Sequence, residues 1–364
     1  MPPIVEAEAA DLLGLTASLV AVPSVSHEER RLADEIEARL GARAATLKTE
    51  RVGDSVVART DHGRTRRIVV GGHLDTVPAN GNADPRVDGD TLHGLGAADM
   101  KGGLAVMLRL AEDAAGGAAD HDLTLVFYEC EEVADEFNGV RRLFDERPDL
   151  VVGDLAILME PTANRVEAGC QGSLHVAAHF AGERAHTARP WMGRNAIHHV
   201  AEVLGRIADH EPETVEVDGL QYREALQVVR IEGGVANNVV PDACVLTVNR
   251  RFAPRVSVDD AFGQVAKLLE GADRVELVSA SPAGPPNLGD PLVADFIATV
   301  AAPVGPKLGW TDVARFASRG IPALNYGPGD PAIAHTAGER VDRASLEAAY
   351  SALAGFLHLR RDRG

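Results

Sequence analysis

The sequence predicts an α/β fold with a mainly parallel central sheet. Short apolar runs at 68–70, 123–128 and 155–158 have the composition of buried strands. Helical patterns at 100–115 and 139–147 stand between these runs. Buried strands that alternate with helices are typical of a parallel sheet whose faces are covered by helices.

The same pattern continues toward both ends of the chain. Residues 7–20 and 26–41 have the periodicity of helices, and Ser26 with Glu29 has the spacing of a capping box at the start of the second one. A strand at 322–326 precedes a C-terminal helix. The α/β pattern therefore opens and closes the chain.

The rhythm changes in the middle of the chain, where the sequence predicts an inserted two-layer α+β module. Its expected strands are 174–180, 226–231 and 244–250, and its expected helices are 195–208 and 258–269, with Ser257 as a cap. A cluster of prolines from Pro282 to Pro286 indicates a linker. The predicted domains are a discontinuous one at 1–172 and 284–364 and an inserted one at 173–283.

Composition limits the possible partners. The chain has 36 Lys and Arg against 54 Asp and Glu, a formal charge of −18, which argues against a nucleic-acid partner but leaves an anionic small molecule possible. Cys130, Cys170 and Cys244 form no paired motif, as is usual in a reducing compartment. The first basic residue is Arg30 and no apolar run approaches the ~20 residues of a membrane span, so we expect a cytoplasmic protein.

Acidic and imidazole side chains follow the predicted strands, and this position is the strongest functional signal in the sequence. Ligands of open α/β sheets bind beyond the carboxyl ends of strands. Several carboxylates converging there need a cation, because a buried unpaired charge is costly. The residues in these positions are His73, Glu131, Glu132, Glu160 and His335.

Taken singly, each of these signals has a structural alternative. His73 with Asp75 fits a metal ligand and the group that orients it, but equally fits a polar strand-end turn. Glu131 and Glu132 can divide metal binding and proton transfer between them, or belong to a solvated acidic turn. A lone late His335 is more often structural than a ligand. The shared position at strand ends favours the metal site.

Asp99 lies in the Gly-rich segment 94–103, for which four interpretations compete. A dinucleotide-binding loop needs Gly where Asp99 stands, and the Gly-Lys-Ser/Thr of a phosphate-binding loop is absent. A carboxylate at the start of a helix, with small residues around it, can bridge two metal ions. The remaining alternative is an Asp that merely caps the helix.

Together these motifs resemble those of the co-catalytic zinc aminoacylase and carboxypeptidase superfamily. The resemblance rests on GGHLDTVP at 71–78, GLGAADMKGG at 94–103, EE at 131–132, EPT at 160–162 and AHT at 334–336. It implies a zinc-exopeptidase-like catalytic domain that carries an inserted dimerisation, or lid, domain. It also implies two divalent metals per chain, zinc with cobalt possible in one site.

Within that superfamily the chain is most similar to the actinobacterial type of succinyl-diaminopimelate desuccinylase. The residues behind this closer resemblance are AGCQGSLH at 168–175, RAHTARPWMGRNAIH at 184–198, NNVVPDACVLTVNRRFAP at 237–254 and NYGPGDPAIAHT at 325–336. It implies hydrolysis of N-succinyl-LL-2,6-diaminopimelate to succinate and LL-diaminopimelate. Acetylornithine deacetylases and other deacylases or dipeptidases share much of this frame, and an inactive binding homologue is a further alternative.

The resemblance also implies a role for each matching residue. One metal takes His73, Asp99 and Glu160, and the other takes Asp99, Glu132 and His335, so that Asp99 bridges the two. The remaining roles are Asp75 orienting His73, Glu131 as general base, His186 stabilising the oxyanion in the partner's active site of a homodimer, and Asn238, Arg251 and Gly327 holding the substrate.

Two positions depart from the pattern of the family. Leu95 stands where many relatives have Arg, and Arg250 stands where relatives often have Tyr. Neither residue is an expected metal ligand, so the departures concern the substrate. Arg250, Arg189 and Arg315 are further candidates for binding its carboxylates, although each fits a surface charge equally well.

Overall fold

The protein is described by a computed structural model that covers residues 2–117 and 119–359. The chain forms two compact units, each of them discontinuous in sequence. The first unit takes the described residues up to Ala168, Asn287–Gly305 and those from Arg315 onward. The second takes Gly169–Pro286 and Pro306–Ala314, so residues 306–314 belong to it although the sequence assigns them to the catalytic domain.

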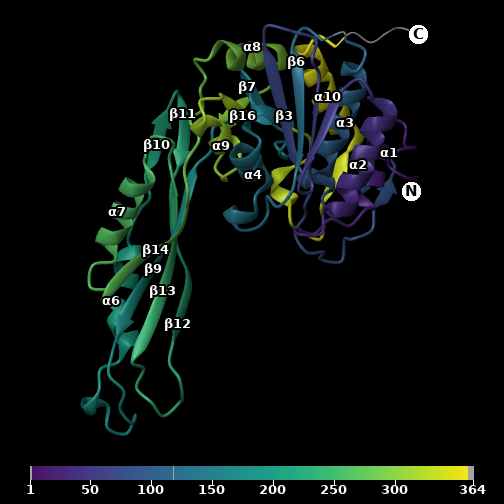
Figure 1. Cartoon of the computed structure of the whole chain (residues 1–364). Helices are drawn as coiled ribbons and strands as arrows, with labels where there is room; N and C mark the ends of the chain where they lie inside the picture. The colour runs from purple at the N-terminus through teal and green to yellow at the C-terminus, as the bar shows by residue number, and fades with distance from the viewer. Residues whose placement is uncertain (1, 118, 360–364) are drawn as a thin grey trace. The chain divides into compact units, whose positions relative to one another are not determined.

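The first unit is built on an eight-stranded sheet in the order β1-β2-β6-β3-β7-β16-β8-β15 (Figure 1). Strands β6, β3, β7 and β16 are parallel to their neighbours within that set, as the sequence predicts. Strands β1, β2 and β8 pair antiparallel, so the sheet is mixed. The bounds are β1 Lys48–Val52, β2 Ser55–Arg59, β3 Arg67–His73, β6 Asp122–Tyr128, β7 Leu155–Leu158, β8 Val166–Ala168, β15 Val304–Pro306 and β16 Ala323–Asn325.

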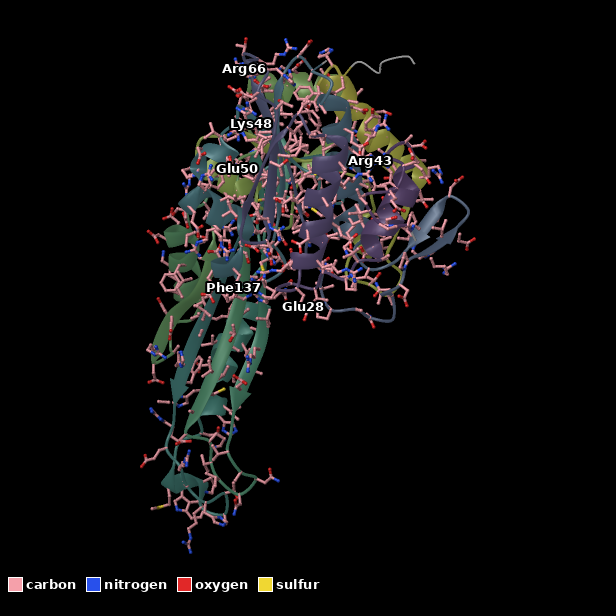
Figure 2. All side chains as sticks on the ribbon, turned by 45° about the vertical axis from the view of Figure 1, so that its right-hand side comes forward. Glu28, Arg43, Lys48, Glu50, Arg66 and Phe137 are labelled. Carbon is pink, nitrogen blue, oxygen red and sulfur yellow. The ribbon has the colours of Figure 1, made fainter. Side chains whose placement is uncertain are left out.

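Helices and a small second sheet complete this unit. Helices α1, α2, α3, α8 and α10 share one continuous apolar core with the sheet. Charged side chains such as Lys48, Glu50 and Arg66 lie at exposed positions outside that core (Figure 2). The helices are α1 Leu12–Val20, α2 Arg30–Arg43, α3 Gly102–Ala114, α4 Gly139–Glu146, α5 Pro148–Val151, α8 Pro291–Val300 and α10 Arg343–Phe356, together with α9 Val313–Ser318, which begins in the second unit and ends in the first. The small sheet joins β4 Arg86–Asp88, β5 Thr91–His93 and β17 Arg340–Asp342.

The second unit has an antiparallel sheet in the order β12-β13-β9-β14, with α6 and α7 packed on it. Side chains alternate along β9, and Leu174, Val176 and Ala178 are buried against the helices. Ser257 caps α7 through the amide of Asp260, as the sequence predicts. The bounds are β9 Gly172–Ala181, α6 Ala196–Ala208, β12 Ala225–Gly233, β13 Ala243–Phe252, α7 Val258–Leu268 and β14 Arg274–Ser281, and a hairpin joins β10 Thr214–Val217 to β11 Leu220–Arg223.

The start of α2 differs from the sequence prediction. The helix begins at Arg30 rather than at 26, and the side chain of its N-cap residue, Glu29, makes no capping hydrogen bond. Ser26 and Glu29 point instead to long-range partners, Asp75 and Cys130. The capping box predicted for this segment is therefore wrong.

Each helix in the described part of the chain is too short or too polar to cross a lipid bilayer.

Candidate metal centre

Four neighbouring parallel strands bring the predicted ligands to one edge of the sheet. Strand β3 ends on His73 itself, β6 leads into Glu131 and Glu132, and β7 leads into Glu160. His335 follows β16. Because parallel strands all end at the same edge, side chains that lie far apart in the sequence converge there.

The bridging candidate Asp99 lies between two imidazoles. It stands in the irregular turn Ala97–Lys101 that precedes α3, and its peptide bond to Met100 is cis. Its Oδ1 lies 3.0 Å from Nε2 of His73, and its Oδ2 lies 3.3 Å from Nε2 of His335. His335 Nε2 is also 2.7 Å from Oε1 of Glu132. Each oxygen of Asp99 thus faces a different histidine.

The remaining donors complete two ligand sets with Asp99 in common. His73, Asp99 and Glu160 have donor atoms within 4.8 Å of one another, and so do Asp99, Glu132 and His335. Imidazole nitrogens with carboxylate oxygens, three from the protein at each position, are the donors of catalytic zinc sites. The set therefore fits a pair of divalent ions, and His73 also lies in a third group with Glu131 and Glu132.

The field at this edge of the sheet favours positive charge. Burial lowers the pKa of His73, but its hydrogen bond with Asp99 and the nearby carboxylates raise it well above its usual value overall. Hydrogen bonds with Asp99 and Glu132 raise the pKa of His335 to about 10. Burial raises the pKa of Asp99, and both histidines lower it further than burial raises it. A field that holds protons on imidazoles also attracts a metal cation.

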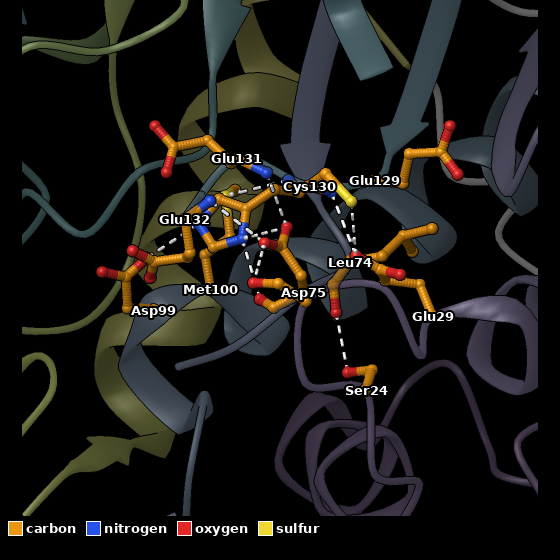
Figure 3. A network of polar contacts seen from close by, with 12 residues as sticks. Ser24, Glu29, Leu74, Asp75, Asp99, Met100, Glu129, Cys130, Glu131 and Glu132 are labelled. Atoms are coloured by element: carbon orange, nitrogen blue, oxygen red, sulfur yellow. Dashed lines mark hydrogen bonds and ion pairs between the residues drawn. The ribbon is translucent and has the colours of Figure 1, made fainter. Parts of the chain in front are cut away.

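Asp75 braces the centre with both its carboxylate and its backbone (Figure 3). Its backbone oxygen lies 2.9 Å from Nδ1 of His73, whereas its carboxylate is 3.6 Å away. The carboxylate accepts the amides of Glu131 at 2.9 Å and Glu132 at 3.0 Å. Asp75 thus orients His73 mainly through its carbonyl and fixes the two glutamates through its side chain.

A second buried carboxylate, which the sequence does not reveal, supports the backbone of the bridging candidate Asp99. Oε1 of Glu339 accepts the backbone amides of Ala98 at 3.1 Å and Asp99 at 3.0 Å. Burial raises the pKa of Glu339. The nearby ammonium of Lys101 donates to the carbonyl of Val22, and burial lowers its pKa to about 7. The sequence carries no local signal for this contact, because Glu339 and Asp99 lie 240 residues apart.

In the second unit, His186 and Asn238 are neighbours. His186 bridges to Val239, and the amide of Thr187 donates to the carbonyl of Asn238. Nδ1 of His186 accepts the amide of Ala188 at 3.0 Å, so a neutral ring carries its proton on Nε2. The exposed His186 therefore presents an N–H donor to the solvent.

The predicted substrate residues differ in what they already contact. Arg251 is half-buried, its guanidinium makes no hydrogen bond or ion pair with the described residues, and burial lowers its pKa. Arg250 is buried in an ion pair with Glu224 at 2.8 Å, and Arg315 pairs with Asp135 at 2.5 Å. The two paired arginines serve the fold, whereas the guanidinium groups of Arg251 and of the exposed Arg189 remain candidates for binding an anion.

Gly327 has a structural role that the sequence analysis did not anticipate. Its amide donates to Oγ1 of Thr162 at 3.1 Å, and its carbonyl accepts the amide of Asn164 at 3.0 Å. A Cβ atom here would lie 2.5 Å from the carbonyl oxygen of Met159. The amide and carbonyl of Gly327 thus both have partners within the protein.

Residues 69–359 match the model of peptidase family M20/M25/M40. The chain belongs to this family. Its members are hydrolases that depend on a pair of metal ions, which agrees with the two ligand groups described above. The match extends over both units of the chain.

Relatives of this family member align over nearly its whole length. It is 48% identical over 348 residues to the putative succinyl-diaminopimelate desuccinylase of Mycobacterium tuberculosis, covering 95% of this chain and 98% of that one. It is 43% identical over 341 residues to the succinyl-diaminopimelate desuccinylase of Corynebacterium glutamicum, with coverage of 91% and 92%. The fold matches the Bacillus subtilis YXEP protein, described as a dinuclear metal binding peptidase, with a TM-score of 0.72, 14% identity and coverage of 97% and 99%.

Proposed function

We propose that this M20 family member is a succinyl-diaminopimelate desuccinylase, which hydrolyses N-succinyl-LL-2,6-diaminopimelate to succinate and LL-diaminopimelate. The observation that carries the proposal is the pair of ligand sets that share Asp99, next to Glu131, in a chain whose near full-length relatives bear that name. The reaction belongs to the supply of lysine and of peptidoglycan precursors.

His73, Asp99 and Glu160 would hold one ion, and Asp99, Glu132 and His335 the other. We propose zinc, with cobalt possible in one site, because nitrogen and oxygen donors of this kind suit both. When bound, such a pair polarises the scissile carbonyl and lowers the pKa of water. The protein contributes the spacing of the ligands and the hydrogen bonds that fix their positions.

Glu131 is the proposed general base. Its carboxylate takes a proton from the attacking water and later gives it to the leaving amine. Its amide is held by Asp75, so its backbone cannot shift without breaking a partly buried hydrogen bond. A fixed backbone supports the role of Glu131 as the base, because its carboxylate then approaches the substrate in one orientation.

His186 is the proposed donor to the oxygen of the scissile carbonyl as negative charge develops on it. The bond from Ala188 to Nδ1 supports this role, because it leaves the proton of the ring on Nε2. We further propose a homodimer in which His186 reaches the active site of the partner subunit. Arg251 and Asn238 bind carboxylates of the substrate, as the unpaired guanidinium suggests.

The test is turnover of N-succinyl-LL-diaminopimelate beside N-acetylornithine and a set of dipeptides, with the metal content of the same preparation measured. We expect the succinyl substrate to give the highest kcat/KM, and activity to depend on added Zn²⁺ or Co²⁺. A higher kcat/KM for an acetyl or peptide substrate would assign the chain to another deacylase of the family. Metal-loaded protein that turns over none of them would contradict an enzymatic role.

A further inference from the structure

The segment Ser24–Glu29, which precedes α2, lies against the loop that follows β3. The amide of Thr76 donates to the carbonyl of Ser24 at 2.9 Å, and the amide of Ser26 donates back to Thr76 at 3.2 Å. Oγ of Ser24 donates to the carbonyl of Leu74 at 2.8 Å (Figure 3). Residues 24–26 therefore form a short bridge to the loop that carries Asp75.

At the end of this segment, the carboxylate of Glu29 contacts the loop that carries the proposed base, Glu131. Oε1 of Glu29 accepts the amide of Cys130 at 3.1 Å and lies 3.3 Å from the Cys130 thiol (Figure 3). The amides of the next two residues, Glu131 and Glu132, go to Asp75. Three consecutive amides are thus held by the carboxylates of Glu29 and Asp75. Oγ of Ser26 donates to Oδ2 of Asp75 at 2.8 Å and ties that carboxylate to the bridge.

Cys130 is the residue where this loop turns. Its φ is 57°, in the left-handed region that non-glycine residues rarely adopt. Its side chain is buried, and Glu29 is only 1% exposed. Leaving the buried amide of Cys130 without an acceptor would be costly. Without Glu29, the turn would therefore shift so that this amide finds another partner. The conformation immediately before Glu131 therefore depends on Glu29.

We propose that Glu29 is a positioning residue, which acts through the backbone of Cys130 to hold Glu131 at the angle that the reaction requires. This inference rests on the proposed role of Glu131 as base. Glu29 touches neither a metal ligand side chain nor Glu131 itself in the contacts described. Its effect is on orientation, where a displacement of ~1 Å can reduce turnover ~10²-fold.

A role as the cap of α2 does not account for these contacts. Glu29 makes no side-chain hydrogen bond to the first turn of that helix. Its oxygen accepts from Cys130 and from the amide of His27 at 3.0 Å. The neighbouring Glu28 is exposed and lies at the same end of the helix (Figure 2). It offers a carboxylate of matched charge that does not reach the loop.

The experiment compares Glu29→Leu, Glu29→Gln and the control Glu28→Gln, each saturated with Zn²⁺. For Glu29→Leu we expect kcat to fall ~10–100-fold while KM stays within about twofold of wild type. Glu29→Gln keeps an acceptor for the Cys130 amide, so it should recover much of the kcat that Glu29→Leu loses. The recovery should be incomplete, because the acceptor loses its charge and hydrogen bonds to charged acceptors are about twice as strong. Glu28→Gln should match wild type.

Hydrogen exchange of the peptide spanning 129–133 provides a readout that needs no substrate. We expect exchange there to be fastest in Glu29→Leu, intermediate in Glu29→Gln and unchanged in Glu28→Gln. Should Glu29→Leu not fold, Glu29→Gln against wild type decides by the same exchange. Unchanged exchange and kcat in the Glu29 variants, or a loss carried by KM alone, would overturn the proposal. Failure of wild type to hydrolyse the succinyl substrate would reject the proposed function, while the exchange result would still decide on Glu29.

Discussion

The two units of this protein place their functional groups in different ways. In the first, His73 is 1% exposed and lies at the end of a buried strand, and its two ring nitrogens contact Asp75 and Asp99. In the second, His186 and Asn238 lie in exposed loops. Arg251 lies on a strand of the second unit, and its guanidinium has no hydrogen-bond or ion-pair partner among the described residues. The first unit holds its candidate metal ligands through contacts within the protein, whereas the second presents hydrogen-bond donors to the solvent.

This difference separates two kinds of effect. Substitutions among the braced residues of the first unit should change metal binding or the chemical step. Substitutions in the second unit should leave the metals in place and change how the substrate or its transition state is held. The separation fails if a substitution in one unit produces the effect expected of the other.

Glu131→Gln should remove the base without removing a proposed metal ligand. General bases typically contribute ~10²–10⁴-fold, and we expect kcat to fall toward the upper end of that range with both ions retained. Steady-state kinetics and elemental analysis of the same sample measure the two quantities. A variant that keeps kcat within tenfold of wild type would show that another group takes the proton.

His186→Ala should lower kcat ~10²–10³-fold, the usual cost of removing one oxyanion donor. The metal content should stay that of wild type, because none of the proposed ligands lies in the second unit. The matched control is His198→Ala, since His198 is an exposed imidazole of the same unit on α6. Loss of metal in His186→Ala, or equal losses of kcat in both variants, would contradict the separation.

Arg251→Gln should act on substrate binding. Hydrogen bonds to charged groups contribute ~1.5–3 kcal/mol, so we expect KM to rise ~10–100-fold. Arg255→Gln removes an exposed arginine of the same unit and should leave KM unchanged. An Arg251 variant with normal KM for the succinyl substrate would remove this residue from the binding site.

The smallest expected effect is a pH dependence of the metal-free protein. His335 has a folded pKa of about 10 against 6.5 unperturbed, so its stabilisation is complete below pH 6.5 and is lost as pH rises through 10. Tm of the apo protein should therefore fall between pH 7 and pH 10, and less so in His335→Gln. Zinc-loaded protein should show less of this decline, because metal binding displaces the proton. Equal pH slopes of Tm for the apo and loaded forms would contradict this account.

The sequence was informative where local pattern and topology agree. Short apolar strands followed by His73, Glu132 and Glu160 could be recognised because parallel strands end at one edge of a sheet. The antiparallel strands β1, β2 and β14 were not predicted, because a single sequence does not show which segments will find a partner and pair as strands.

Contacts between distant segments were the other gap. Ser26 and Glu29 have the spacing of a capping box, and only the fold shows that their acceptor and donor are Asp75 and Cys130. Arg250 likewise looked available to a substrate until its partner Glu224 was seen. A local motif cannot reveal a partner that lies tens of residues away.

The central claim is a dinuclear centre in which Asp99 serves both ions, and metal stoichiometry tests it most directly. Wild-type protein titrated with Zn²⁺ should bind two ions per chain at high affinity. Glu160→Ala and His335→Ala should each weaken one ion and keep the other, whereas Asp99→Ala should weaken both. One ion in wild type, or one ion retained at wild-type affinity by Asp99→Ala, would contradict the shared ligand.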